Sequence, residues 1–325
     1  MADLARLAKG RFLVIGRAGM DLYADPPGTR VEDATRFTTA LGGSSANIAV
    51  ALTRQGAQAA LLGCVSDDAV GRFCLAQLDA YGIDRTHVRA VGGEVRNSLA
   101  VVETRVNDCQ SVIYRNNAAD FAMTRADVES VDYPGFAALI TTGTVLAAQP
   151  SRSAAFHAFA LARAAGLPLI FDVDYRPYSW PSAAVAAETY SRAAALCDVI
   201  VGNEEEFGFM AGDPSQGLAK ARSLIGEGAR IVVYKMGERG AVTITPEGEG
   251  ATGIYPTQAL KPTGAGDSFL GAFIAALGRG QPVESAVRRG SAAAAMVVAR
   301  VGCAPAMPTL AELDAFLANH PGPTR

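Results

Sequence analysis

The chain has 325 residues, half of them apolar, which is enough for the core of one large α/β domain. Its formal net charge of −3 argues against nucleic acid or an anionic membrane as the main partner, because both call for a basic surface.

Cysteine and histidine usage bears on compartment and metal content. The five cysteines are scattered without a CxxC pair, and the three histidines lie far apart, so we expect reduced thiols and no zinc site. Residues 1–11 lack the continuous apolar segment of a signal peptide, and the longest apolar tract is too short for a membrane span. We therefore expect a cytoplasmic protein.

The first elements alternate between buried and exposed segments. The apolar run 12–16 ends in glycine and predicts a buried parallel strand. Residues 17–41 hold prolines and many polar positions, which predict exposed β structure with turns. A helix, a strand and a second helix are expected at 46–55, 59–65 and 71–81. Residues 97–115 alternate polar and apolar side chains, so the two polar β regions are expected to pair as a small sheet over the main domain.

From about residue 137 the pattern becomes strand–helix–strand. Strands are expected at 137–140, 168–173, 199–201 and 231–235. Helices are expected at 151–165, 183–196, from 204, and at 217–225, 266–278, 283–299 and 309–319. Such alternation produces a parallel sheet with helices on both faces. No repeat or linker is evident, so we expect a single domain over residues 1–325.

The most informative string is Thr263-Gly264-Ala265-Gly266-Asp267-Ser268, at the start of an apolar helix. Its two glycines allow a turn that presents several backbone N–H groups to one point, where the helix N-terminus favours an anion. Asp267 adds a carboxylate beside this cradle, which suits an enzyme that needs a base next to a phosphoryl group. The tripeptide Gly-Ala-Gly alone would favour a plain loop, with Asp267 as an acidic residue in the first turn of the helix. The full string, followed directly by an apolar helix, favours the anion-binding site.

Three more strings open helices or follow strands. In Gly42-Gly43-Ser44-Ser45-Ala46-Asn47, Asn47 can donate and accept, although a serine-capped helix start explains the string equally well. Asn203 and Glu206 share one helix face and could hold magnesium through water, or simply cap the helix. Lys235 could reach a phosphate, or the string after it could form a β-turn.

The run from Asp172 to Trp180 follows a strand and combines acids, an arginine and aromatic residues. Arg176 offers a fork for a carboxylate or phosphate, although a loop held to the surface by its aromatics is the alternative. Asp21 could accept from sugar hydroxyls or form a turn. Arg115 ends an expected strand and could equally be a solvated charge.

Together, in this order and spacing, these strings resemble the ribokinase-like (PfkB) family of carbohydrate kinases, over roughly residues 12–317. The resemblance implies a ribokinase-like three-layer α/β/α fold with a mostly parallel central sheet. It also implies a small β lid, here from residues 17–41 and 97–115, which often pairs into homodimers. The segments 16–22, 114–115, 172–180 and 306–309 resemble those of family members that phosphorylate a sugar acid, whose carboxylate would suit Arg176 or Arg115.

The resemblance also implies a role for each matching residue. Asp267 matches the catalytic base, and Gly264, Ala265 and Gly266 match the anion hole. The sugar acid would be bound by Asp21, Gly43, Asn47, Arg115, Asp174 and Arg176. Asn203, Gly237, Gly240 and Ser291 match family positions that bind ATP, and we expect Lys235 and Thr263 to bind it as well. Magnesium would be held by Glu206 and Asn203, through water.

One departure from the family concerns Lys261, which stands where many relatives have an aspartate that helps to hold a potassium ion. We expect the Lys261 ammonium to replace that ion, so that no monovalent cation is required. Alternative substrates are 2-keto-3-deoxygluconate, fructose and ribose, and a catalytically silent sugar or nucleotide sensor is the alternative from another class. A dinucleotide oxidoreductase is excluded, because residues 16–21 lack the G-x-G-x-x-G spacing.

Overall fold

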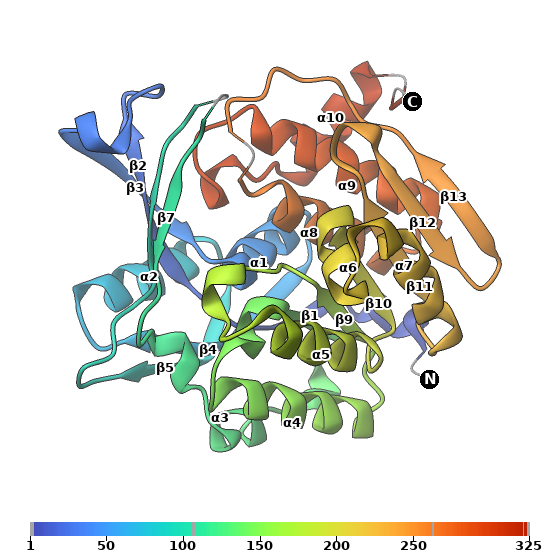
Figure 1. Ribbon diagram of the computed structural model, residues 1–325, viewed down its shortest axis with the longest axis horizontal. Helices are drawn as coiled ribbons and strands as arrows, with labels where there is room; N and C mark the ends of the chain where they lie inside the picture. The colour runs from blue at the N-terminus through green and yellow to red at the C-terminus, as the bar shows by residue number, and fades with distance from the viewer. Residues whose placement is uncertain (1–2, 106–107, 262, 321, 324–325) are drawn as a thin grey trace.

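The computed structural model describes residues 3–105, 108–261, 263–320 and 322–323, so residues 106 and 107 of the expected lid lie outside it. The described strands form a nine-stranded sheet in the order β13-β12-β11-β10-β9-β8-β1-β4-β5 (Figure 1). Their bounds are β1 Arg11–Ile15, β4 Gln58–Ser66, β5 Asp84–Val91, β8 Ala138–Thr142, β9 Leu169–Asp172, β10 Val199–Asn203, β11 Ile231–Lys235, β12 Ala241–Thr245 and β13 Gly248–Thr252. All neighbours pair in parallel except β12 and β13, which form an antiparallel edge.

A second, four-stranded sheet stands to one side of the first, at the upper left of Figure 1. It contains β2 (Gly19–Asp25), β3 (Arg36–Gly42), β6 (Leu99–Val102) and β7 (Ser111–Tyr114), in the order β3-β2-β6-β7. The two polar β regions thus pair with each other, through β2 and β6. We call this sheet the lid sheet; its movement as a lid stays a prediction.

Helices cover both faces of the large sheet, which makes three layers. One face carries α1 (Ser44–Arg54), α2 (Ala69–Ala80), α8 (Ala265–Gly278) and α9 (Val283–Val298), and α10 (Leu310–Asn319) packs on α9. The other face carries α3 (Arg125–Glu129), α4 (Ser151–Ala164), α5 (Ala183–Ala194), α6 (Glu204–Ala211) and α7 (Gly217–Gly226). None of the described helices combines the length and the apolar character needed to cross a membrane.

The apolar pattern of the strands explains these layers. In β1, Phe12 and Val14 are buried under the first set of helices, whereas Leu13 and Ile15 are buried under the second. Side chains alternate along a strand, so a continuous apolar run requires cover on both faces. Each such side chain contributes about 1.5–3 kcal/mol by its burial.

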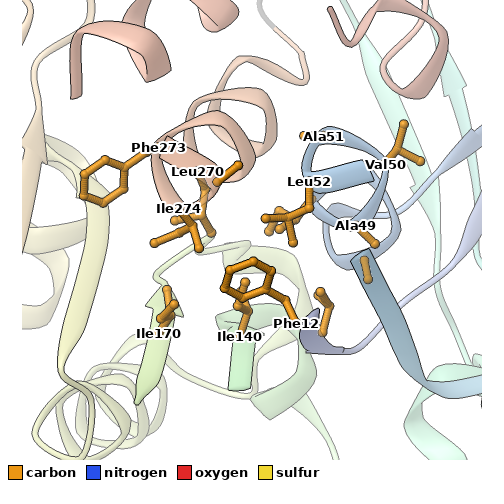
Figure 2. Close-up of a cluster of buried hydrophobic side chains, with 14 of the residues drawn as sticks. Phe12, Ala49, Val50, Ala51, Leu52, Ile140, Ile170, Leu270, Phe273 and Ile274 are labelled. Carbon is orange, nitrogen blue, oxygen red and sulfur yellow. The ribbon is translucent and has the colours of Figure 1, made fainter. Parts of the chain in front are cut away.

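The packing of α1 against α8 places the N-terminal ends of both helices together. Figure 2 shows Leu52 of α1 beside Leu270 and Ile274 of α8, over Phe12 and strands β8 and β9. The helices approach closely because Gly271 has no side chain; a Cβ there would lie 2.3 Å from the Cβ of Ala51.

The predicted fold class is confirmed, and every helix and strand named above has a counterpart within a few residues. The sequence pattern did not indicate β5, α3, β12 or β13. Strand β5 is half-buried or exposed along its length and β13 is mostly exposed, so neither shows an apolar run.

Candidate active site

Polar side chains gather where the parallel strands end. Asp172 ends β9, Asn203 ends β10 and Lys235 ends β11. The register sets Asp172 beside Val201, and Asn203 beside Lys235. Ligands of parallel sheets collect beyond the carboxyl ends of the strands, so this edge is the expected place for a site.

The N-terminus of α8 forms a turn at this edge. Gly264 is the N-cap with φ +84°, where a Cβ would also lie 3.0 Å from the Cys303 Sγ. The first hydrogen bond of the helix runs from the Ser268 N–H to the Gly264 carbonyl, at 3.0 Å. The amides of residues 265–267 therefore precede the helical hydrogen-bond pattern and can receive an anion.

Asp267 lies in the first turn of α8 and is half-buried. The Asn47 Nδ2 donates to its Oδ2 at 2.9 Å. Burial, reinforced by the negative charge of Asp174, raises the pKa of Asp267 to about 7, against the opposing effects of Asn47, Arg176 and Lys235. A carboxyl group with this pKa can both take up and release a proton near neutral pH.

Two lysines flank the turn. The Lys235 Nζ lies 3.4 Å from the point where a Cβ on Gly266 would stand, so its charge adjoins the start of α8. Lys261 is fully buried, and its Nζ donates to the Thr263 carbonyl at 2.5 Å. Burial lowers the pKa of Lys261, while Cys303 and Asp21 act in the opposite direction.

Asp21 lies in β2, at the base of the lid sheet, and is buried. The Tyr23 hydroxyl contacts the Asp21 Oδ2 at 3.0 Å and the Cys303 Sγ at 3.2 Å. Burial raises the pKa of Asp21. A Cβ on Gly42 would stand 1.9 Å from the Asp21 Oδ1, so the absence of a side chain there makes room for this carboxylate. Gly43 has φ +94°, which allows the turn into α1.

The loop after β9 is held in place by both its charges and its aromatics. Asp174 has φ +39°, and its Oδ1 lies 2.8 Å from the Arg176 Nη2, while its buried Oδ2 has no hydrogen-bond partner in the described residues. Tyr175 stacks on Phe209 with ring centroids 3.7 Å apart. The aromatic residues thus anchor the loop, in agreement with the alternative that the loop is held to the surface by its aromatics. The anchored loop presents Asp174 at the sheet edge.

Arg115 is not a solvated charge, because only 8% of it is exposed. It pairs with the Asp120 Oδ2 at 2.5 Å and donates to the Thr144 carbonyl at 3.0 Å. It also lines a cavity of about 180 Å³ together with Phe121 and Tyr178, between β7 and the loop after β9.

Asn203 and Glu206 form a capping box at the start of α6. The Glu206 N–H donates to the Asn203 Oδ1 at 2.8 Å, and the Asn203 N–H donates to the Glu206 Oε2 at 2.7 Å. The Tyr175 N–H donates to the other carboxylate oxygen at 3.1 Å. Burial raises the pKa of Glu206, although Lys235 opposes this. The capping alternative is thus observed, and it leaves lone pairs for a water-mediated contact.

The remaining predicted nucleotide residues lie on three elements. Gly237 and Gly240, with φ +57° and +81°, enclose the turn after β11. The Thr263 Oγ1 is buried without a hydrogen-bond partner in the described residues. Ser291 is half-buried on α9. Their contacts with a nucleotide stay predictions.

Two residues of this region, Asp172 and Arg17, lie in strings that were named from the sequence, but they received no role of their own there. Asp172 is buried beside Lys235, Asp174 and Glu206, and burial raises its pKa well above the ordinary value. Its position at the end of a strand was the available signal. Arg17 is buried in the turn after β1, and only its surroundings reveal its importance.

Comparison with known proteins finds similarity over nearly the whole chain. Residues 9–310 match the model of the pfkB family carbohydrate kinases. A 5-dehydro-2-deoxygluconokinase of Geobacillus kaustophilus (strain HTA426) is 38% identical over 314 residues, which cover 95% of this chain and 94% of that protein.

Solved structures share the fold over nearly the whole chain. A PfkB protein from Polaromonas sp. JS666 superposes with a TM-score of 0.83 at 30% identity, over 94% of this chain and 99% of that one. A fructokinase double mutant from Vibrio cholerae O395 was solved with fructose, ADP and a potassium ion. It superposes with a TM-score of 0.84 at 28% identity, over 95% of this chain and 98% of that one.

Proposed function

The chain belongs to the pfkB family of carbohydrate kinases, and we propose on that basis that it transfers the γ-phosphoryl group of ATP to the terminal (6-)hydroxyl of a sugar acid. The proposed substrate is 5-dehydro-2-deoxy-D-gluconate, in myo-inositol catabolism, which the names of the similar proteins support. The observation that carries the proposal is the Asp267 carboxyl at the N-terminus of α8, with its pKa raised to about 7 and an amide donor 2.9 Å away.

Asp267 is the proposed general base. The acceptor hydroxyl would lie between its carboxylate and the γ-phosphate, and Asp267 would take the hydroxyl proton as the bond to phosphorus forms. The Asn47 amide orients the carboxylate and favours its ionised form. The Asn47 Oδ1 is buried and has no partner in the described residues, so it can accept from the substrate.

The start of α8 is the proposed anion hole. The amides of Gly264, Ala265 and Gly266 would receive the charge that develops on the transferred phosphoryl group. The Lys235 ammonium, beside Gly266, adds positive charge at the same place. Phosphoryl transfer depends mainly on such positioning and neutralisation, so these groups match the needs of the reaction.

Magnesium would arrive with ATP. In the described residues no group of three or more histidine, cysteine, aspartate or glutamate side chains is placed to hold a metal ion. Glu206 and Asn203 already exchange hydrogen bonds with backbone amides, so they fit an ion that keeps its waters and its phosphate ligands. Such an ion would neutralise phosphate charge.

Lys261 is proposed to replace a monovalent cation. Its buried ammonium donates to the Thr263 carbonyl, directly before the anion hole. A backbone carbonyl oxygen is the type of ligand that a potassium ion would use, and a second positive charge beside this ammonium would be repelled. The V. cholerae fructokinase double mutant was solved with potassium, whereas we propose that this chain needs none.

We also propose a homodimer formed through the lid sheet, and the cytoplasm as the compartment. Val112 and Tyr114 of β7 and Phe37 of β3 are large apolar side chains exposed on that sheet. Edge strands with such side chains are natural sites for pairing. All five cysteines are unpaired, which suits a reducing compartment.

A substrate panel tests the function. Purified protein with magnesium-ATP is assayed for ADP release with 5-dehydro-2-deoxy-D-gluconate, 2-keto-3-deoxygluconate, fructose and ribose. The highest kcat/KM is expected for the first compound. A preference for fructose or ribose would overturn the sugar-acid assignment, and absence of ATP turnover with every compound would favour a non-catalytic sensor.

A further inference from the structure

Arg17 differs from the other buried arginines of the described chain. Three arginines there are more than nine-tenths buried, namely Arg17, Arg115 and Arg289. Arg115 pairs with Asp120 at 2.5 Å, and Arg289 pairs with Asp314 at 2.6 Å. Arg17 has no carboxylate within 4 Å in the described residues. The Nε of each of the three arginines is buried without a partner in the described residues, so the missing carboxylate is what distinguishes Arg17.

The Arg17 side chain makes a single hydrogen bond to the described residues. Its Nη1 donates to the Ser98 Oγ at 3.2 Å, which leaves most of its five N–H donors unused. Gly19 has no side chain, and this lets Ser98 pack closely beside the guanidinium, since a Cβ on Gly19 would stand 2.8 Å from the Ser98 Oγ and 3.5 Å from the Arg17 Nη1. A buried charge without an ion-pair partner is costly, and native proteins rarely keep one without a use.

The position of Arg17 indicates that its side chain can bind a ligand. It lies in the turn after β1, at the same sheet edge as Asp21 and Asp174. The Arg17 carbonyl lies 2.5 Å from the point where a Cβ on Gly43 would stand, directly after Gly42, which packs on the Asp21 carboxylate. Burial raises the pKa of Asp21, and the positive charge of Arg17 opposes this; the same charge favours the ionised form of Asp174. Both aspartates belong to the proposed sugar site. An anion that enters this site would meet the open side of the Arg17 guanidinium.

We propose that Arg17 binds the carboxylate of the sugar acid and thereby selects acidic over neutral substrates. This assignment rests on the proposed function. The planar guanidinium fork matches a carboxylate with two parallel N–H···O bonds, which a neutral sugar cannot supply. Such a bond completes the ion pair that the folded chain leaves open.

The two arginines that the sequence indicated for this role are already paired. Arg176 lies 2.8 Å from Asp174, and 45% of its side chain is exposed. Arg115 holds Asp120 and the Thr144 carbonyl. Binding the substrate with either one would require competition with an internal carboxylate, whereas Arg17 binds without displacing one.

The charges that act most on Asp267 are those of Asp174, Arg176 and Lys235, and Arg17 is not among them. A sugar acid is phosphorylated at the end opposite to its carboxylate, so its anion-binding group should be remote from the base.

Steady-state kinetics of variants test the assignment. Arg17→Met is compared with the wild type and with Arg289→Met, which removes another buried guanidinium, one that pairs with Asp314 of α10. We expect Arg17→Met to raise the KM for 5-dehydro-2-deoxy-D-gluconate by about 10- to 100-fold, with the KM for ATP and the kcat changed by less than about threefold. Arg289→Met should leave the KM for the sugar acid unchanged.

Arg17→Lys is measured instead if Arg17→Met does not fold. Lysine keeps the charge but not the fork, so the KM for the sugar acid should rise at least about threefold. An unchanged KM in the folded Arg17 variant would overturn the assignment while leaving the kinase function intact. A parallel rise in the KM for ATP, or a loss confined to kcat, would show a structural role and also overturn it. A wild-type enzyme that prefers neutral sugars would refute the proposed function itself.

Discussion

The side-chain amide of Asn47 donates a 2.9 Å hydrogen bond to the carboxylate of Asp267 and so joins the first turn of α1 to the first turn of α8. The two residues are 220 positions apart in the chain. Because Gly271 lets α1 and α8 pack closely, the proposed base and its orienting amide are set by the helix–helix interface.

Replacement of the proposed base should separate binding from turnover. Asp267→Asn keeps the volume of the side chain but cannot accept the hydroxyl proton, so kcat should fall by at least about 10²–10⁴-fold. The dissociation constant for ATP, measured by calorimetry, should change little. Near-normal turnover would contradict the role of Asp267.

The pH dependence of kcat should report the same carboxyl group. The pKa of Asp267 is raised to about 7, and the base must be ionised, so kcat should rise as the pH increases through about 7. Asn47→Ala removes a donor that favours the ionised form, so it should move this rise to higher pH. Rate profiles from pH 5.5 to 9 for both proteins check this, and a rise at the same pH in the variant would contradict it.

The raised pKa of Asp267 should also make the free energy of unfolding depend on pH, in the direction opposite to kcat. The folded-state pKa of Asp267 lies above the ordinary value of 3.8, so the folded state holds its proton more tightly than the unfolded state. The resulting stabilisation is present at low pH and is lost as the pH rises from about 4 to 7. Asp267→Asn does not titrate and should therefore gain stability relative to the wild type between pH 5 and pH 8. Urea unfolding at both pH values measures the difference, and a pH-independent difference would count against the raised pKa.

Glu206 should combine capping with nucleotide binding. Glu206→Ala removes the capping box of α6 and should lower the free energy of unfolding by about 1 kcal/mol, and it should raise the KM for magnesium-ATP about tenfold. Glu312→Ala is the matched control, because it removes the capping box of α10. The control should lose similar stability and keep its KM, whereas equal KM values in the two variants would restrict Glu206 to capping.

Lys261 should make the enzyme independent of potassium. Exchange of potassium for tetramethylammonium should change the wild-type rate by less than about twofold, since the buried ammonium already holds the Thr263 carbonyl. Lys261→Met should lower kcat at least about tenfold, whereas Lys220→Met, which breaks an ion pair on α7, should not. A wild-type enzyme that requires potassium would refute the replacement.

Most of the fold could be read from local patterns, because a buried strand or an amphipathic helix shows its burial in its own residues. The run at 12–16 indicated β1, and the stripe behind Asp267 indicated α8. The edge strands β5 and β13 were missed, because a strand with little buried surface is defined by its hydrogen bonds to a neighbour.

The proposed site likewise contains some features that the sequence could predict and others that it could not. The turn at Gly264 and the cap at Asn203 depend on residues within a few positions, so their strings were informative. Whether a charge is paired depends on distant parts of the chain. Arg115 is an example, since the sequence left it as either a binding group or a solvated charge, and burial with Asp120 decided against solvation.

The sequence by itself determined the family, the central sheet and the glycine turn at the start of α8 that we propose to bind phosphate, since glycine conformation, helix starts and apolar periodicity are local properties. Only the tertiary structure decided the electrostatics, because desolvation and Coulomb interactions depend on which residues the fold brings together. It raised the pKa of Asp267, buried Lys261 beside the proposed anion hole, and left Arg17 as a buried cation without a carboxylate partner in the described part of the chain.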